Sequence, residues 1–204
     1  MDKNPANFVP LTPISFLHRT ADIYGDRTAV VYENMSYTWK ETRERCVRIA
    51  SSLGAHGVEP GDTVSVLAFN TPEMFESHFS IPMAGAVLNT INVRLDADTI
   101  AYILDDSNAK ILLVDRELFE VASEAISISS SSPTIVLIDD SFAEPGPEIS
   151  INTVSYESLI NQGDPSFNWH KPNNEWQPLS LNYTSGTTGQ PKGVVYHHRG
   201  SYLM

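Results

Sequence analysis

The sequence has 204 residues, of which 41% are hydrophobic and 19% are charged, and its formal net charge is −12 at pH 7. This composition is typical of a globular chain with a sizeable core and excludes a disordered one. The acidic balance disfavours nucleic acid and anionic membranes as partners, although a local loop of backbone N–H groups can still bind phosphate. No run is apolar enough to predict a membrane span.

The first 60 residues predict a helix and a β-hairpin at the entry of the chain. Residues 12–24 carry apolar side chains at helical spacing, which predicts a helix. Thr28–Tyr32 and Met35–Trp39 are β-prone segments on either side of a two-residue turn, a pattern typical of a short hairpin.

A second helix follows the hairpin directly. Thr38 and Glu41 have the spacing of a capping box, in which each side chain satisfies a backbone N–H group of the other residue. The helix is expected to run to about His56. The single cysteine, Cys46, cannot form an internal disulfide, which fits a reducing compartment. Its helical spacing predicts a core position shared with Ile49, Ala50 and Leu53.

Residues 61–140 predict strands that alternate with helices. Strands that are separated by helices along the chain are typical of a parallel sheet with helices on both faces. The sequence therefore predicts an α/β fold with three layers. The predicted elements are a strand at Thr63–Phe69, a helix starting at Thr71, a helix at Asp98–Asp106, a strand at Lys110–Val114, a helix at Glu117–Ile128 and a strand at Thr134–Ile138.

The pattern loosens after these strands and sharpens again near the end. Residues 141–178 predict an irregular connection with one helical turn. Leu179–Tyr183 and Gly193–Tyr196 are expected to be strands, and a helix is expected over Arg199–Met204. We therefore predict one domain portion with four parts, namely 1–60, 61–140, 141–178 and 179–204.

The segment between the last two predicted strands, YTSGTTGQPKGV at Tyr183–Val194, has the chemistry of a phosphate-binding loop. Gly186 and Gly189 allow the backbone to turn its N–H groups toward an anion. Hydroxyl donors and one cation complete the set, and they come from Ser185, Thr187, Thr188 and Lys192.

This loop does not match the common nucleotide fingerprints. Lys192 is followed by Gly193 rather than by Ser or Thr, so the loop is not a Walker A motif, and G-x-G-x-x-G is absent. A loop of this composition is often a plain flexible turn. The ordered combination with Pro191, Lys192 and Gly193 instead favours a phosphate site.

The segment Tyr183–Val194 resembles the AMP-binding signature of the adenylate-forming enzymes, which include acyl-CoA synthetases, luciferases and nonribosomal peptide adenylation domains. The resemblance extends upstream through His78–Leu95 and Ala109–Asp115, and the residues of these segments most resemble those of plant acyl-activating enzymes. All 204 residues are covered, but they match only about the first third of such an enzyme. The fold is then expected to be the N-terminal part of the large domain.

The resemblance implies roles for seven residues. Thr184, Ser185, Gly186, Thr187, Thr188, Gly189 and Lys192 would form the loop that closes over the ATP β- and γ-phosphates, with Lys192 as the catalytic cation. The family converts a carboxylic acid and Mg²⁺-bound ATP to an acyl-adenylate and pyrophosphate, and passes the acyl group to coenzyme A. The implied function is that of an acid–thiol ligase with ATP, Mg²⁺, coenzyme A and a small carboxylic acid as partners.

Two adjacent histidines follow the signature at His197 and His198. His198 aligns with a histidine often found after this motif, but we interpret His197, His198 and Arg199 as the start of a surface helix without a catalytic role. Zinc binding is not expected, because no further ligands lie at suitable spacing, and no metal site is predicted.

The resemblance leaves two hypotheses for the function. The later motifs for adenine, ribose and the acyl group have no counterpart, so we expect a truncated form that is inactive by itself. The chain then either belongs to an acyl-CoA synthetase or serves as a non-catalytic binding module. Residues 1–13 lack the apolar core of a signal peptide, so we expect a cytoplasmic or peroxisomal location.

Overall fold

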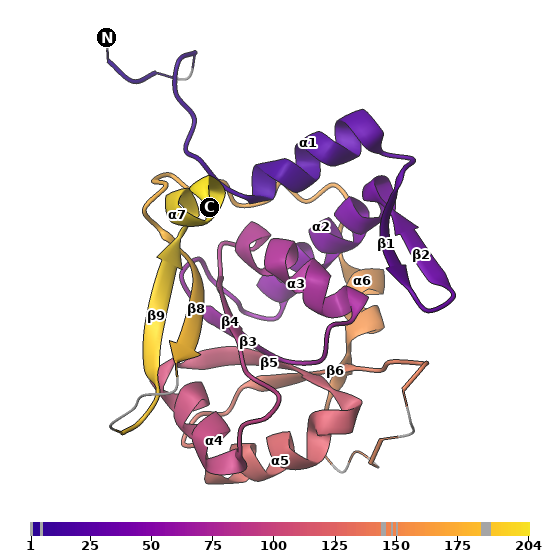
Figure 1. Cartoon of the computed structure of the whole chain (residues 1–204), viewed down its shortest axis with the longest axis vertical. Helices are drawn as coiled ribbons and strands as arrows, with labels where there is room; N and C mark the ends of the chain where they lie inside the picture. The colour runs from indigo at the N-terminus through magenta and orange to yellow at the C-terminus, as the bar shows by residue number, and fades with distance from the viewer. Residues whose placement is uncertain (1, 5, 144–145, 148, 150, 185–188) are drawn as a thin grey trace.

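The structure is a computed structural model that describes residues 2–4, 6–143, 146–147, 149, 151–184 and 189–204. Within these residues, helices cover both faces of one mixed sheet, and a two-stranded hairpin lies beside it (Figure 1). The α/β fold with three layers is therefore confirmed. The elements are α1 (Ile14–Tyr24), β1 (Thr28–Tyr32), β2 (Met35–Thr38), α2 (Trp39–Ala55), β3 (Thr63–Leu67), α3 (Pro72–Met83), β4 (Val87–Thr90), α4 (Ala97–Asp106), β5 (Ala109–Asp115), η1 (Arg116–Leu118), α5 (Phe119–Ile128), β6 (Thr134–Ile138), β7 (Val154–Ser155), α6 (Tyr156–Gln162), β8 (Pro178–Thr184), β9 (Lys192–His197) and α7 (His198–Leu203).

The strands lie in the order β7–β6–β5–β3–β4–β8–β9, and every neighbouring pair is parallel except β8 and β9. The parallel arrangement agrees with the prediction from the sequence, but β4 and β7 were not predicted. Strand β4 has only four residues and follows Gly85, whose φ of +83° turns the chain out of α3. The apolar residues of β4 therefore cannot be distinguished in the sequence from those of the preceding helix, although β4 lies near the middle of the sheet.

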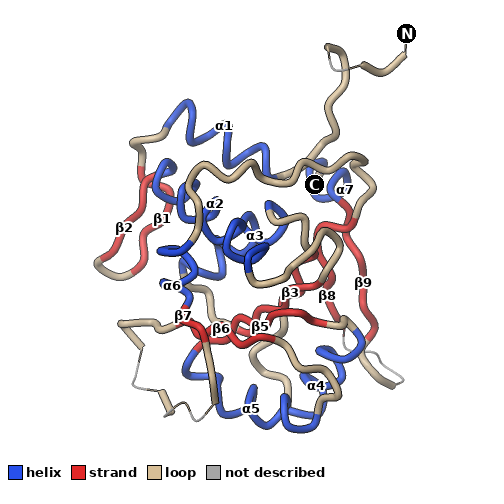
Figure 2. Tube along the Cα trace, turned by 180° about the vertical axis from the view of Figure 1, so that it is seen from behind, coloured by secondary structure: helices blue, strands red, loops and turns tan. Residues whose placement is uncertain are grey.

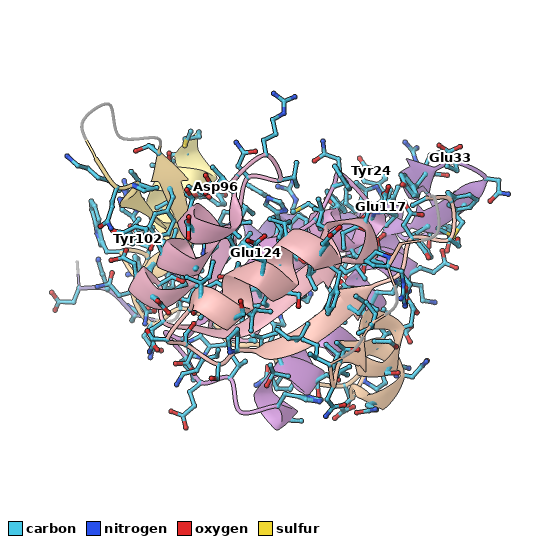
Figure 3. The ribbon with its side chains drawn as sticks, turned by 90° about the horizontal axis from the view of Figure 1, so that it is seen from below. Tyr24, Glu33, Asp96, Tyr102, Glu117 and Glu124 are labelled. Atoms are coloured by element: carbon cyan, nitrogen blue, oxygen red, sulfur yellow. The ribbon has the colours of Figure 1, made fainter. Side chains whose placement is uncertain are left out.

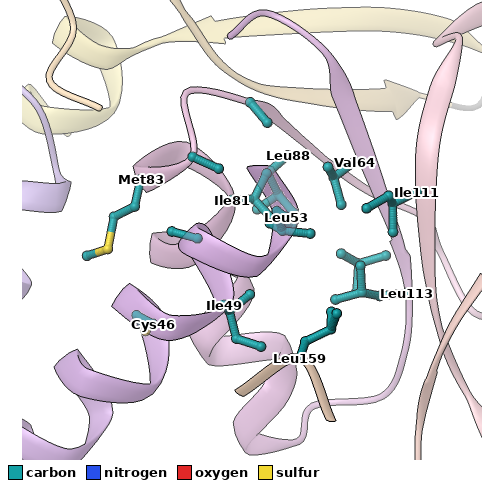
Figure 4. Packing of buried hydrophobic residues seen from close by; sticks show 14 of the residues in the cluster. Cys46, Ile49, Leu53, Val64, Ile81, Met83, Leu88, Ile111, Leu113 and Leu159 are labelled. Atoms are coloured by element: carbon teal, nitrogen blue, oxygen red, sulfur yellow. The ribbon is translucent and has the colours of Figure 1, made fainter. Parts of the chain in front are cut away.

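The helices divide between the two faces of the sheet. Helices α2, α3 and α6 cover one face, α4 and α5 cover the other, and α1 packs on the outside of α2 (Figures 1 and 2). Strand side chains alternate between the two cores. Val64, Ile111 and Leu113 point toward α2 and α3, where they meet Leu53 and Ile81 (Figure 4). Such a sheet, covered on both faces, explains the nearly continuous apolar strands.

Helix α2 begins as the sequence predicts. The Thr38 hydroxyl accepts a hydrogen bond from the Glu41 backbone N–H at 3.2 Å, and the Glu41 carboxylate accepts one from the Thr38 backbone N–H at 2.8 Å. Cys46 is fully buried on the core face of this helix (Figure 4). Burial raises the pKa of the Cys46 thiol well above its ordinary value. The core position predicted for Cys46 is confirmed.

An ion cluster around the buried Glu76 carboxylate joins the three helices on this face. The Arg45 guanidinium of α2 donates to the Glu76 carboxylate of α3 at 2.5 Å and to Glu157 of α6 at 2.8 Å. The Tyr156 hydroxyl donates to Glu76 at 2.9 Å. Burial raises the pKa of Glu76 to about 7, and the neighbouring guanidinium opposes that shift. Each polar group in this cluster has a partner, as buried polar groups require.

Candidate functional site

The hairpin β8–β9 carries the predicted phosphate loop at its open end. Thr184, the last residue of β8, pairs with Lys192, the first residue of β9, and both side chains are exposed. Gly189 has a φ of +155°, a conformation that residues with a side chain rarely adopt. The other four predicted residues, Ser185, Gly186, Thr187 and Thr188, lie outside the described residues. The structure thus brings the two ends of the loop together.

The two ends of the loop lie at the carboxyl edge of the sheet. Strand β8 runs parallel to β4, so Thr184 and Thr90 end their strands at the same edge. In open α/β sheets, ligands bind in the crevice outside the carboxyl ends of the strands. The position of the loop therefore agrees with a ligand-binding role, although this loop joins two antiparallel strands rather than a strand and a helix.

A crevice of about 760 Å³ opens beside the loop, between the ends of β4 and β8 and the start of α4. Its volume is in the range of pockets that hold small molecules. Its polar side chains offer neutral hydrogen-bonding groups, and apolar side chains form the rest of the lining. The lining includes Thr90, Asn92, Thr99, Asn182, Thr184 and Pro191. We call this space the loop crevice.

Side-chain hydrogen bonds fix the wall that β8 contributes to the loop crevice. The Thr90 hydroxyl donates to the Asn182 amide oxygen at 2.8 Å and links β4 to β8. The Tyr183 hydroxyl donates to Asp106 at 2.6 Å, and its ring meets the Tyr102 ring edge-on at a centroid distance of 6.5 Å. Figure 3 shows Tyr102 on the side of α4 that approaches the hairpin. Burial and the bond to Asp106 raise the pKa of the Tyr183 phenol above its ordinary value.

Gly193 has a packing reason to be glycine. A Cβ atom at this position would lie 2.9 Å from Leu181 Cδ1 and 3.4 Å from the Tyr183 ring. The close approach lets the start of β9 lie flat against β8, directly after Lys192. A side chain at this position would require the tip of Leu181 to move.

The interpretation of His198 as part of a surface helix is wrong. It does begin α7, but its side chain is buried, and its Nδ1 atom lies 2.9 Å from the Thr12 hydroxyl. Burial lowers the pKa of His198 to about 4, and the nearby His170 and His197 add to the shift. The reason is tertiary: the chain segment before α1 passes over this position, which no local pattern reveals. His197 instead caps α7 by accepting a hydrogen bond from the Gly200 backbone N–H at 2.9 Å.

Sequence reasoning missed the polar residues of the loop crevice. Asn92 lies in the loop after β4 and Thr99 in the first turn of α4, whereas Asn182 lies in β8, far from both in the sequence. One signal was available, because Asn92 comes shortly after β4 and Asn182 lies near the carboxyl end of β8. Because β4 was not predicted, the sequence alone could not place Asn92 and Asn182 at the same edge of the sheet.

The described residues contain no cluster of three or more His, Cys, Asp or Glu side chains that could hold a metal ion. Among the same residues, no helix is both long and apolar enough to cross a bilayer.

The sheet, the loop ends and the loop crevice together define an α/β domain with a ligand-sized site at its carboxyl edge. The family model of AMP-binding enzymes matches residues 17–203, and the chain belongs to this family. It is 48% identical over 206 residues to a 2-methylpropanoate–CoA ligase of Humulus lupulus. It is 46% identical over 223 residues to a peroxisomal trans-cinnamate:CoA ligase of Petunia hybrida. These matches cover 98% and 100% of the chain, respectively.

The solved structures agree with the family. The crystal structure of an anthranilate CoA ligase in complex with anthranoyl-AMP superposes with a TM-score of 0.84 and 25% sequence identity over 97% of the chain. The chain spans only 37% of that protein, 37% of the Humulus lupulus relative and 38% of the Petunia hybrida relative. It therefore corresponds to the N-terminal part of these larger proteins.

Proposed function

We propose that the chain supplies the ATP phosphate-binding part of an acid–thiol ligase, which activates a carboxylic acid through an acyl-adenylate and transfers it to coenzyme A. The observation that carries this proposal is the paired position of Thr184 and Lys192, which holds the ends of the signature loop beside the loop crevice. Membership of the AMP-binding family and the CoA ligase relatives support it.

The described residues fit the phosphates of ATP. Lys192 is exposed at the start of β9, where its ammonium group can reach an anion, and Thr184 adds a hydroxyl on the facing strand. The reaction displaces pyrophosphate, so a cation placed near the departing oxygens stabilises the transition state. Mg²⁺ is usually bound through one or two carboxylates, several waters and the substrate phosphates, so this part of the chain needs no dedicated metal cluster.

The two named relatives act on a short branched acid and on an aromatic acid, according to their names. We therefore propose a small carboxylic acid as the substrate, without choosing between these classes. A peroxisomal location, which the name of one relative carries, and a cytoplasmic one both fit the proposal.

Pyrophosphate exchange tests the role of Lys192. The test protein is a ligase in which these 204 residues are joined to the remaining C-terminal part of the Humulus lupulus relative. We expect Lys192→Ala to slow the exchange by the equivalent of about 2–4 kcal/mol, because the lost contact is made mainly in the transition state. The free energy of unfolding should hardly change, since Lys192 is exposed.

The matched control is Lys110→Ala, which removes an exposed lysine near the amino end of the central strand β5. This end of the strand lies opposite the carboxyl edge that carries the loop. Its exchange rate should equal that of the parent. Equal rates for Lys192→Ala and Lys110→Ala would contradict the assignment of Lys192. Absence of any exchange in the parent ligase, together with failure to bind ATP, would favour the non-catalytic binding module.

A further inference from the structure

The far end of β9 is attached to a segment from the beginning of the chain. Thr12 Oγ1 and His198 Nδ1 lie 2.9 Å apart, and both residues are buried. The Thr12 hydroxyl oxygen also accepts a hydrogen bond from the Ile14 backbone N–H at 3.3 Å, so it joins the start of α1 to the start of α7. Figures 1 and 2 both show α7 beside the N-terminal end of α1.

Glu175 makes a second link between the same two segments. Its carboxylate accepts a hydrogen bond from the Leu11 backbone N–H at 3.0 Å and forms an ion pair with Arg199 at 2.5 Å. The Arg199 backbone N–H donates to the Glu175 carbonyl at 2.8 Å. The Phe16 and Tyr202 rings also stack, with centroids 4.7 Å apart. We call this set of contacts the N-terminal clasp, and its residues are Leu11, Thr12, Phe16, Glu175, His198, Arg199 and Tyr202.

Apart from its backbone ladder with β8, strand β9 has few other restraints along its length. It is the edge strand, with β8 as its one strand neighbour among the described residues, and Val194, Val195 and Tyr196 are 40%, 57% and 39% exposed. Packing of its side chains therefore does little to fix its register on β8. The ladder also contains a register irregularity at Pro178–Ser180, opposite the end of β9.

A slip of β9 would affect the loop directly. The side-chain period of a strand is two residues, so a shift by one residue would turn each β9 side chain to the other face of the sheet. Lys192 would then leave its place opposite Thr184. The backbone ladder holds β9 at its middle, and the N-terminal clasp holds the end that follows His197.

We propose that the N-terminal clasp positions Lys192, with Thr12 and His198 as positioning residues for the phosphate loop. This inference rests on the proposed function, because it assumes that Lys192 meets the ATP phosphates. The buried hydrogen bond between Thr12 and His198 fixes where α7 begins, and thereby where β9 ends. The segment before α1 thus contributes to the nucleotide site from the opposite end of the hairpin, without contacting the nucleotide.

Amide hydrogen exchange in the 204-residue chain tests the mechanical part. Thr12→Val keeps the shape of the side chain but leaves the His198 ring nitrogen without its partner. We expect the amides of residues 193–196 to exchange about tenfold faster, because a buried hydrogen bond is lost at the end of their strand. Thr12→Ser keeps the hydroxyl and should restore slow exchange, while β3 and β5 should not change in either variant.

Thr42→Val is the matched control, since the Thr42 hydroxyl is buried but finds no hydrogen-bond partner among the residues that the structure describes. It should leave the exchange of residues 193–196 unchanged. If Thr12→Val does not fold, His198→Leu breaks the same bond from the other side. Unchanged exchange at 193–196 would overturn the proposal, because the contact would then not restrain β9. An equal increase in β3 and β5 would also overturn it, because the contact would then stabilise the whole fold rather than β9.

Kinetics of the joined ligase described above test the functional part. We expect Thr12→Val to raise the KM for ATP about fivefold and to leave the KM for the acid unchanged, with Thr12→Ser close to the parent. Local loosening of β9 without any change in the KM for ATP would overturn the positioning of Lys192. An inactive parent ligase would contradict the proposed function alone, and the exchange result in the 204-residue chain would still report on the clasp.

Discussion

Strands β5 and β9 belong to the same sheet but have opposite surroundings. Six of the seven residues of β5 are buried and only Lys110 is exposed, whereas five of the six residues of β9 are exposed. Strand β5 lies between β3 and β6 under helices on both faces, and β9 lies at the edge. The covered centre of the sheet therefore supplies stability, while the hairpin leaves both ends of the signature loop, Thr184 and Lys192, exposed.

This difference also separates two ways of fixing a strand. Apolar packing specifies the register of β5, because a slip would move its side chains into the wrong core. Strand β9 lacks that restraint and depends on the backbone ladder with β8 and on contacts at its ends. Substitutions in the two regions should consequently change different measured quantities.

The largest effect should come from the ion cluster under the covered centre. Arg45→Ala leaves the Glu76 carboxylate buried without its guanidinium. We expect the free energy of unfolding to fall by about 3–5 kcal/mol at pH 8. The loss should be smaller at pH 5, because burial raises the pKa of Glu76 to about 7 and the carboxyl is then neutral. Urea unfolding at both pH values measures the difference.

The control for this prediction is Arg43→Ala, which also removes an arginine from α2. Arg43 pairs with Asp22, whose side chain is 68% exposed, and such surface pairs contribute roughly 0–1 kcal/mol. Equal losses for Arg45→Ala and Arg43→Ala would mean that the cluster around Glu76 adds nothing beyond a surface ion pair.

A smaller effect should come from one apolar residue in each strand. Leu113→Ala removes a fully buried side chain from β5 and should destabilise the fold by about 3 kcal/mol. Val195→Ala changes a side chain of β9 that is 57% exposed and should cost less than about 0.5 kcal/mol. Denaturant midpoints with unchanged slopes give both values. Similar losses at the two positions would show that β9 is packed as tightly as β5.

The sequence predicted the covered centre well because local signals and burial agree there. The capping box at Thr38, the apolar run of β5 and the core position of Cys46 each follow from a pattern within a few residues. Strands β4 and β7 were not predicted, since runs of four and two residues carry little periodicity. Their place in the sheet depends on pairing with strands that are distant in the chain.

The candidate site was predictable only where one motif contains it. The signature identified the loop from Thr184 to Lys192, but the loop crevice combines residues of β4, α4 and β8. The burial of His198 depends on Thr12, which lies 186 positions earlier. A hydrogen bond over that separation leaves no trace in local spacing, so the surface interpretation of His198 was the natural one and was wrong.

A further small effect concerns a carboxylate outside the covered centre. Asp105, at the end of α4, accepts hydrogen bonds from the Ser129 hydroxyl and from the backbone N–H groups of Ser130 and Ser131. These bonds, that of the Ser129 hydroxyl first, lower the pKa of Asp105 to about 2. Glu76 shows the opposite shift, because burial rather than hydrogen bonding dominates its pKa.

The two shifts give opposite pH dependences. A raised pKa means that the folded state binds more protons, so the Glu76 contribution falls as the pH rises from about 4.5 to 7. A lowered pKa means that the unfolded state binds more, so the Asp105 contribution is complete above its ordinary value of 3.8 and is lost toward pH 2. Because Asp105 is exposed, screening should limit its contribution to roughly 0.5–1 kcal/mol. Asp105→Asn should therefore reduce the stability slightly at pH 7 and flatten its decline between pH 4 and 2. If the stability of the variant declined as steeply as that of the parent between pH 4 and 2, other carboxylates would be responsible for the acid sensitivity.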